Sequence, residues 1–154
     1  MVGWSLSAIG LFFFEQASVD FLKKHMNPNL FKSMKTIIAV QLVIFFILLI
    51  LPSTRSFKVV QLNAAFSYIG IILPLYLYSI ISWKIYAGWL VVAAIVHAGI
   101  TALVFNMGIT INQWFNHHVL THMLMTLYVI FMYYAVIRLH ANYKHLFLSP
   151  NQPF

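Results

Sequence analysis

Residues 85–106, IYAGWLVVAAIVHAGITALVFN, decide the fold class of this chain. The stretch contains no Asp, Glu, Lys or Arg. About 20 apolar residues are enough for an α-helix to cross the hydrocarbon layer of a bilayer. We therefore interpret residues 85–106 as a transmembrane helix, and we use it as the reference for the rest of the chain.

Four further apolar segments flank this helix, at about 4–22, 36–52, 57–82 and 112–138. The segment at 36–52 is short, and the one at 4–22 is interrupted by two acidic residues. The pattern predicts an all-α polytopic membrane bundle of about five transmembrane helices, forming one domain over 1–154. The alternative has four spans, with 4–22 lying on the membrane surface. Pro74 is expected to kink or loosen its helix, because proline lacks a backbone N–H.

The overall composition excludes several classes of protein. Hydrophobic residues make up 62% of the chain and charged residues only 7%, whereas soluble domains contain about 25% charged residues. The net charge of +7 comes from basic residues in short loops, which membrane topology explains better than nucleic-acid binding does. The chain contains no cysteine, which excludes disulfides and thiolate catalysis.

The basic residues predict how the bundle is oriented. With five spans, most of the nine Lys and Arg residues fall on the side that holds the first loop, the third loop and the C-terminal tail. The positive-inside rule places that side in the cytoplasm, so the N-terminus is predicted outside and the C-terminus inside. The short loops suit a bacterial inner membrane.

Polar residues in the apolar segments are predicted to lie at one depth. A helix rises about 1.5 Å per residue, so the distance of each residue from the predicted outer membrane face can be counted. This places one polar group or more from each of the five segments in the outer half of the membrane: Glu15, Gln41, Asn63, Ser67, His97, His118 and His122. Because ionisable groups are costly in a bilayer, such a layer is a candidate functional site.

Three histidines in this layer have the spacing of a metal site. His118 and His122 are four residues apart and share one helix face, and His97 comes from the preceding antiparallel helix. Three protein ligands and one open position are typical of catalytic zinc, which activates water and polarises a carbonyl. Glu15 would then be the general base, a fourth ligand or the partner of an imidazole.

Simpler roles exist for the same residues. His97 alone would serve as a hydrogen-bonded packing histidine, and Glu15 as an acid bonded to Gln41 or to an imidazole. His117 points about 100° away from His118 on a helix and is expected at the membrane interface, near Trp114.

Two other functions fit the same residues. A non-covalent haem b held by His97 and a histidine of the last helix would make the chain a redox subunit. Alternatively, the chain is a non-enzymatic subunit or a proton-coupled transporter, in which Glu15 and the histidines relay protons. Five spans make a thin bundle, so a homo-oligomer or a larger membrane partner is expected in either case.

The stretch FNHHVLTHMLMTLYVIFMYYAV at 115–136 resembles the last helix of the CREST superfamily, which includes alkaline ceramidases and the progestin and adipoQ receptors. The resemblance implies a zinc-dependent hydrolase acting on a lipid amide or ester, with His118 and His122 as ligands. EQASVD at 15–20 is similar to that group's acidic and serine residues near the metal, which implies a catalytic role for Ser18 beside Glu15. The superfamily has seven helices rather than five, and its third histidine lies in an early helix.

Overall fold

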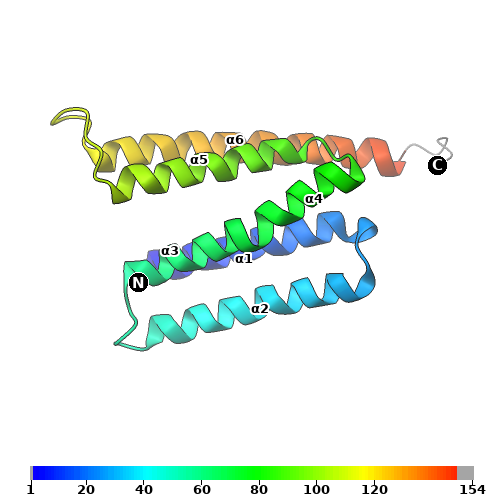
Figure 1. Cartoon of the computed structure of the whole chain (residues 1–154), viewed down its shortest axis with the longest axis horizontal. Coiled ribbons are helices and arrows are strands. Elements are labelled where there is room, and N and C mark those ends of the chain that lie inside the picture. Colours follow the sequence, from blue (N-terminus) through cyan, green and yellow to red (C-terminus); the bar gives the residue numbers. More distant parts are fainter. Residues whose placement is uncertain (1, 149–154) are drawn as a thin grey trace. The chain divides into compact units, whose positions relative to one another are not determined.

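The computed structural model describes residues 2–148, with side chains to residue 141, and all its regular elements are helices. In chain order (Figure 1) they are α1 Val2–Leu22, η1 Lys23–His25, α2 Pro28–Ile50, α3 Phe57–Ala65, η2 Phe66–Ile72, α4 Leu73–Trp83, α5 Gly88–Asn106 and α6 His117–Leu148. Five helical stretches within these residues are long and apolar enough to cross a membrane. The prediction of an all-helical chain with five potential membrane spans is confirmed.

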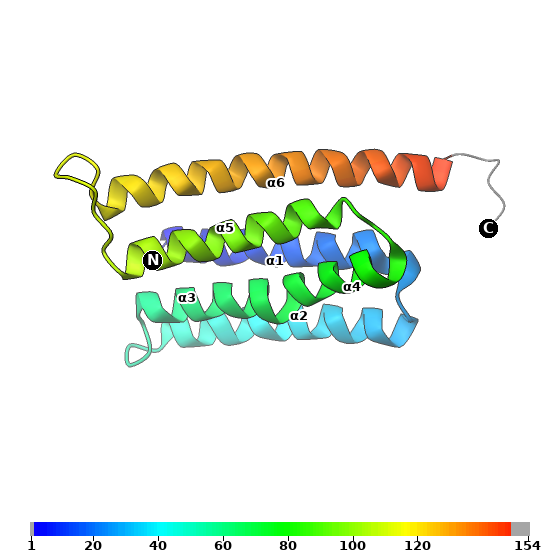
Figure 2. The same cartoon turned by 45° about the horizontal axis from the view of Figure 1, so that its top comes forward.

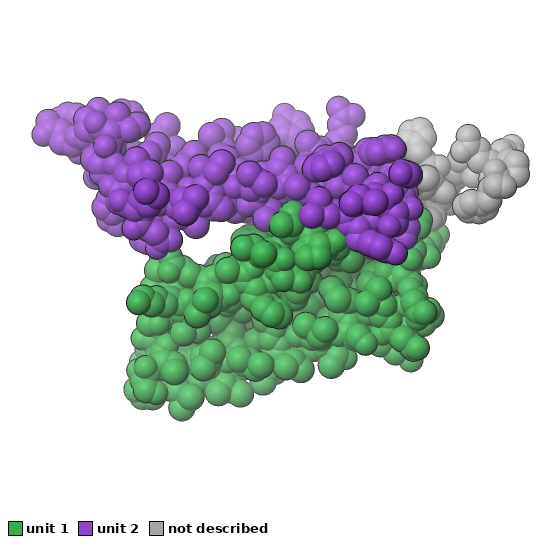
Figure 3. Space-filling model, viewed as in Figure 1, with its two compact units in different colours: residues 1–75 green, residues 76–154 purple. Residues whose placement is uncertain are grey.

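Contacts divide the chain into two compact units, Met1–Leu75 and Tyr76–Phe154 (Figure 3). We call them unit 1 and unit 2 and describe each by itself. That the whole chain folds as one domain remains a prediction, as does the orientation of the termini across the membrane.

Unit 1 is built from α1, α2, α3 and η2. The first two helices run antiparallel, and α3 continues into η2 alongside α1 (Figures 1 and 2). At one end of the unit, Ala8, Phe45 and Leu49 form a buried apolar cluster. Trp4 and Phe57 close this end, with their ring centroids 6.2 Å apart. The packing of α1 against α2 and η2 brings Glu15 of α1 close to both.

Local signals set the ends of α2, which begins earlier than the predicted 36. Asn27 caps the helix by accepting a hydrogen bond from the Asn29 backbone N–H at 2.9 Å, and Pro28 follows at the first helical position, where no N–H is needed. At the other end, the Arg55 guanidinium donates to the carbonyls of Leu49 and Ile50. A cation at this position is also stabilised by the negative end of the helix dipole.

The third span changes its hydrogen-bond pattern in the middle. Residues Phe66–Ile72 form a π-helical segment, and the Leu73 N–H donates to the carbonyl of Tyr68, five residues back. Pro74 follows directly; it has no N–H to donate, and its ring crowds the carbonyl four residues earlier. The wider turn relieves that crowding. The prediction that Pro74 loosens this helix is confirmed.

Unit 2 contains α5 and α6, which lie side by side and antiparallel (Figures 1 and 2). At the start of α5, a Cβ on Gly88 would lie 3.1 Å from Ile80 Cγ1, so glycine permits close packing against α4. The predicted start of the last span at 112 is wrong, because α6 begins at His117. The Asn116 side chain accepts hydrogen bonds from the His118 and Val119 N–H groups and caps the helix there.

Candidate functional site

Unit 1 contains a buried polar cluster centred on Glu15 of α1. The Glu15 side chain is 2% exposed although it belongs to a helix that is apolar enough to cross a membrane. It forms no ion pair with any residue in the described part of the chain. A buried carboxyl without a cation is costly, so its neighbours decide which form of it is stable.

The neighbours of Glu15 are neutral side chains from the other two spans of unit 1. Ser67 of η2 and Gln41 of α2 each form a side-chain hydrogen bond with the carboxyl. Gln41 Nε2 also donates to Ser67 Oγ at 2.6 Å and to Asn63 Oδ1 at 3.1 Å. Glu15 and Ser67 are buried, whereas Gln41 and Asn63 are partly exposed. The structure thus brings together Glu15, Gln41, Asn63 and Ser67, which are the predicted polar residues of the first three spans.

Two oxygens in this cluster have no hydrogen-bond partner. They are Glu15 Oε1 and Gln41 Oε1, both buried acceptors. Buried polar atoms in native proteins are nearly always paired, and an unpaired acceptor loses its hydration without compensation. The cluster therefore has more acceptor capacity than its own donors fill. A proton on the carboxyl or a positively charged ligand would supply what is missing.

Asp20 and Ser18 of α1 have partners outside the cluster. Asp20 forms an ion pair with Lys35 Nζ of α2 at 2.6 Å, and its side chain is 56% exposed. The Ser18 hydroxyl donates to the Phe14 carbonyl at 2.8 Å, an ordinary contact within one helix. A hydroxyl engaged in this way is not activated by a base, so its geometry gives no support to the catalytic role implied for Ser18.

A groove of about 650 Å³ runs along α2 and α3 within unit 1. Its walls are mainly apolar, and several of the side chains that line it, including Ile44, Leu62 and Phe66, are at least half exposed. Gln41 and Asn63 are the amide residues in its lining. The same two residues belong to the Glu15 cluster, so the cluster and the groove share a wall.

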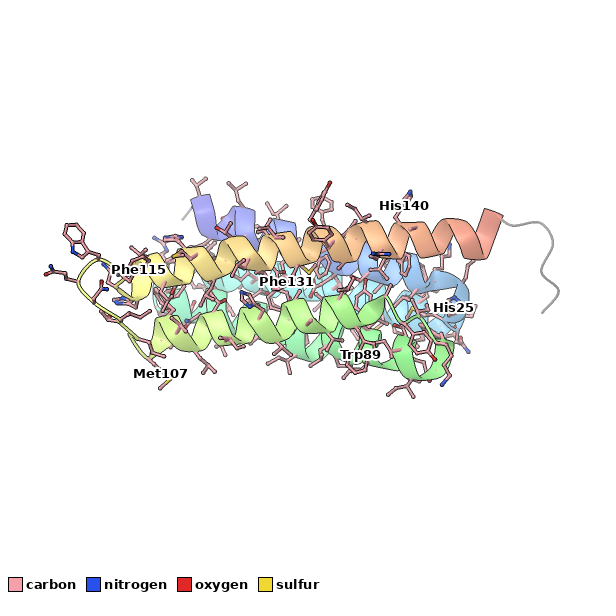
Figure 4. All side chains as sticks on the ribbon, turned by 90° about the horizontal axis from the view of Figure 1, so that it is seen from above. His25, Trp89, Met107, Phe115, Phe131 and His140 are labelled. Atoms are coloured by element: carbon pink, nitrogen blue, oxygen red, sulfur yellow. The ribbon has the colours of Figure 1, made fainter. Side chains whose placement is uncertain are left out.

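In unit 2, His97 of α5 binds the backbone of α6. Its Nε2 lies 2.9 Å from the Leu124 carbonyl oxygen, which can only accept, so Nε2 carries a proton and donates. The Phe131 ring, labelled in Figure 4, packs edge-on with its centroid 5.5 Å from that of His97. His97 is a packing histidine that joins the two helices.

The remaining predicted ligands lie on the first turns of α6. The rings of His117 and His118 are close, with centroids 3.9 Å apart, and Phe105 of α5 packs against both. These histidines follow directly on the loop between α5 and α6, whose ends are marked by the labelled Met107 and Phe115 (Figure 4). The side chains of His118 and His122 are exposed.

This arrangement does not assemble the predicted three-histidine zinc site. Among the side chains that the structure describes, which end at residue 141, no group of three or more His, Asp or Glu residues is placed to hold a metal ion. Nε2 of His97 carries a proton and is committed to Leu124, so that atom is not a ligand for zinc or for haem iron. The three-histidine set of His97, His118 and His122 is therefore not assembled.

Comparison with known proteins gives a family but no function. The profile of one family, described as "Family of unknown function (DUF6962)", matches residues 1–141. No curated protein and no solved structure matches the chain.

Proposed function

The chain belongs to this family of unknown function, and we propose from its own residues that it is a small integral membrane transporter that exchanges a proton at Glu15 for a cationic ligand. The observation that carries the proposal is the Glu15 carboxyl, buried in a potential span with one oxygen unpartnered and no cation beside it. Such intramembrane carboxyls commonly mark ion and proton pathways.

The energetics of the cluster favour two alternating occupants. With a proton in place, Glu15 is neutral and its burial costs little more than that of any hydrogen-bonded polar group. With the proton gone, the carboxylate keeps two neutral donors, Ser67 and Gln41, but needs a positive charge to offset its desolvation. Exchange of a proton for a cation keeps the site neutral throughout, which is the basic requirement of a proton-coupled exchanger.

The competing hydrolase draws less support from the described residues, because no group of three His, Asp or Glu side chains among them is placed to hold a metal ion. The hydrolase and the haem function both need His97 as a ligand, and with Nε2 donating to the Leu124 carbonyl only Nδ1 would be left to bind a metal. The lipid amide or ester hydrolase also draws on Ser18 as a catalytic group, and that hydroxyl is bound to the carbonyl of Phe14. Exchange at Glu15 needs neither His97 nor Ser18.

The surroundings of the transporter complete the proposal. We place it in a bacterial inner membrane, with its N-terminus outside, membrane lipid around its exposed apolar side chains, and a second copy or a larger membrane partner completing the thin bundle. The exposed Val43, Ile47 and Ile50 of α2 are examples of side chains that suit contact with lipid.

Infrared difference spectroscopy of the purified protein in lipid nanodiscs tests the proton site. The difference between spectra at acidic and alkaline pH should contain the carbonyl stretching band of a protonated carboxyl. This band should shift in D₂O, because the carboxyl proton exchanges with solvent. The variant Glu15→Gln should lose the band, because it removes the only buried acid among the described residues.

The matched control is Asp20→Asn on the same helix, which removes the chain's other acid and should leave the band in place. The proposal fails if the band is absent from the wild-type protein or survives in Glu15→Gln. It also fails if the purified protein binds stoichiometric zinc that is lost in His118→Ala, because that result restores the hydrolase.

A further inference from the structure

We infer that the groove on α2 and α3 binds a lipophilic organic cation, whose apolar body lies in the groove and whose positive charge balances the Glu15 carboxylate. This inference rests on the proposed function and names the class of its ligand. It assigns a role to the groove, which no sequence motif indicates.

The walls of the groove determine the body of the ligand. Its volume of about 650 Å³ lies inside the range of about 300–1,000 Å³ that is common for small-molecule sites. Ile37, Val40, Ile44 and Phe45 of α2 line it opposite Val59, Leu62 and Phe66. Because these walls are apolar and several of their side chains are at least half exposed, an apolar molecule dissolved in the bilayer would be able to enter the groove directly.

The shared wall determines the charge of the ligand. Gln41 lines the groove and bonds to Glu15, so a charge placed beside Gln41 is one side chain away from the carboxylate. The low dielectric of this environment strengthens attraction over that distance. The amide oxygens of Gln41 and Asn63 also favour a positive group, and one of them, Gln41 Oε1, lacks a partner.

Other occupants satisfy only one half of the site. A lipid acyl chain suits the apolar walls but brings no charge to the carboxylate. A small, strongly hydrated ion such as Na⁺ would balance the carboxylate but would gain nothing from Ile44 or Phe66. A bulky cation with delocalised charge uses both halves and loses little hydration on entering the groove.

Two ions of the same shape and opposite charge test this inference. Tetraphenylphosphonium and tetraphenylborate should be titrated calorimetrically into the full chain in detergent micelles, with empty micelles as the blank. The phosphonium should bind, and the borate should bind at least about tenfold more weakly, because a difference of about 1.4 kcal/mol in charge interaction gives that ratio. Binding of the phosphonium in weakly buffered solution should also release protons.

Three variants locate the site. Glu15→Gln should weaken phosphonium binding at least about tenfold by removing the charge, and Ile44→Trp should weaken it similarly by filling the groove. The control is Ile47→Trp on the same helix, which is similarly exposed but lies outside the groove, and it should bind like the wild type.

Each contrary result has a separate meaning. Equal binding of the phosphonium to wild type and Glu15→Gln overturns the inference, because the groove would then hold the ion through its apolar body alone. Equal binding to wild type and Ile44→Trp places the ligand elsewhere and also overturns it. If the infrared band behaves as expected while phosphonium binding does not depend on Glu15, the result supports the proton site and contradicts the proposed ligand class. If binding depends on Glu15 but no protonated carboxyl is seen, the result contradicts proton exchange and supports the cation site.

Discussion

At the scale of single residues, the chain treats its two acids in opposite ways. Asp20 lies at the end of α1, half exposed and paired with Lys35, and it behaves as an ordinary surface ion pair. Glu15 lies one and a half turns earlier, buried among neutral groups. Counting residues along each span predicted a common depth for Glu15, Gln41, Asn63 and Ser67, because helical rise is fixed. Counting could not show which helix faces meet, nor that His97 would use its imidazole on a backbone carbonyl.

The buried serines allow a prediction at this scale. Ser67 accepts a hydrogen bond from Gln41 Nε2 and forms another with Glu15. Ser67→Ala therefore removes one hydrogen-bond partner from each of these two side chains. The free energy of unfolding in mild detergent should fall by about 1–3 kcal/mol. Ser79→Ala is the matched control, since Ser79 is equally buried but donates only to the Tyr76 carbonyl of its own helix. Equal losses in the two variants would show that the Glu15 network adds no stability.

At the scale of elements, hydrophobic runs predicted where helices exist better than where they end. The apolar run at 36–52 does not include the first turns of α2, because Lys32 and Lys35 make those turns polar while Asn27 and Pro28 start the helix. The last span was predicted too early because Trp114 and Phe115 are apolar. They belong to a loop in which the Asn112 side chain accepts hydrogen bonds from both their N–H groups. Capping by short polar side chains, rather than hydropathy, sets these boundaries.

The π-helical segment carries the second prediction. With Pro74→Ala, residue 74 regains an N–H and the crowding of the preceding turn disappears, so ordinary four-residue pairing becomes possible through Phe66–Ile72. Amide hydrogen exchange over this segment, followed by mass spectrometry, should slow by at least about tenfold.

Pro28→Ala is the control for this prediction, because Pro28 occupies the first turn of α2, where a missing N–H costs nothing. Exchange over Phe66–Ile72 should be unchanged in that variant. Unaltered exchange in Pro74→Ala would mean that the wide turn is held by the packing of Ser67 and not by the proline.

At the scale of the whole molecule, the course of α1 bears on the number of spans. Within unit 1 this helix packs antiparallel along α2 and places Glu15 against Gln41 and Ser67. A helix lying flat on the membrane surface would run across α2 rather than along it. The packing therefore favours five spans over the four-span alternative, and with five spans the positive-inside rule predicts an outer N-terminus.

The absence of cysteine makes this topology directly testable, because each single-cysteine variant has one reactive thiol. A membrane-impermeant maleimide applied to intact bacterial cells should label Gly3→Cys and Gln113→Cys, which lie in the predicted outer regions. Lys24→Cys, in the first loop, should be labelled only after lysis. Gly3 suits the purpose because a Cβ there meets no atom within 4 Å.

Protection of both Gly3→Cys and Lys24→Cys, with Gln113→Cys labelled, would instead establish four spans with α1 on the cytoplasmic surface. The buried environment of Glu15 would then need a different explanation, because a surface helix exposes its acids to water. Labelling of Lys24→Cys alone would keep the five spans and reverse their direction.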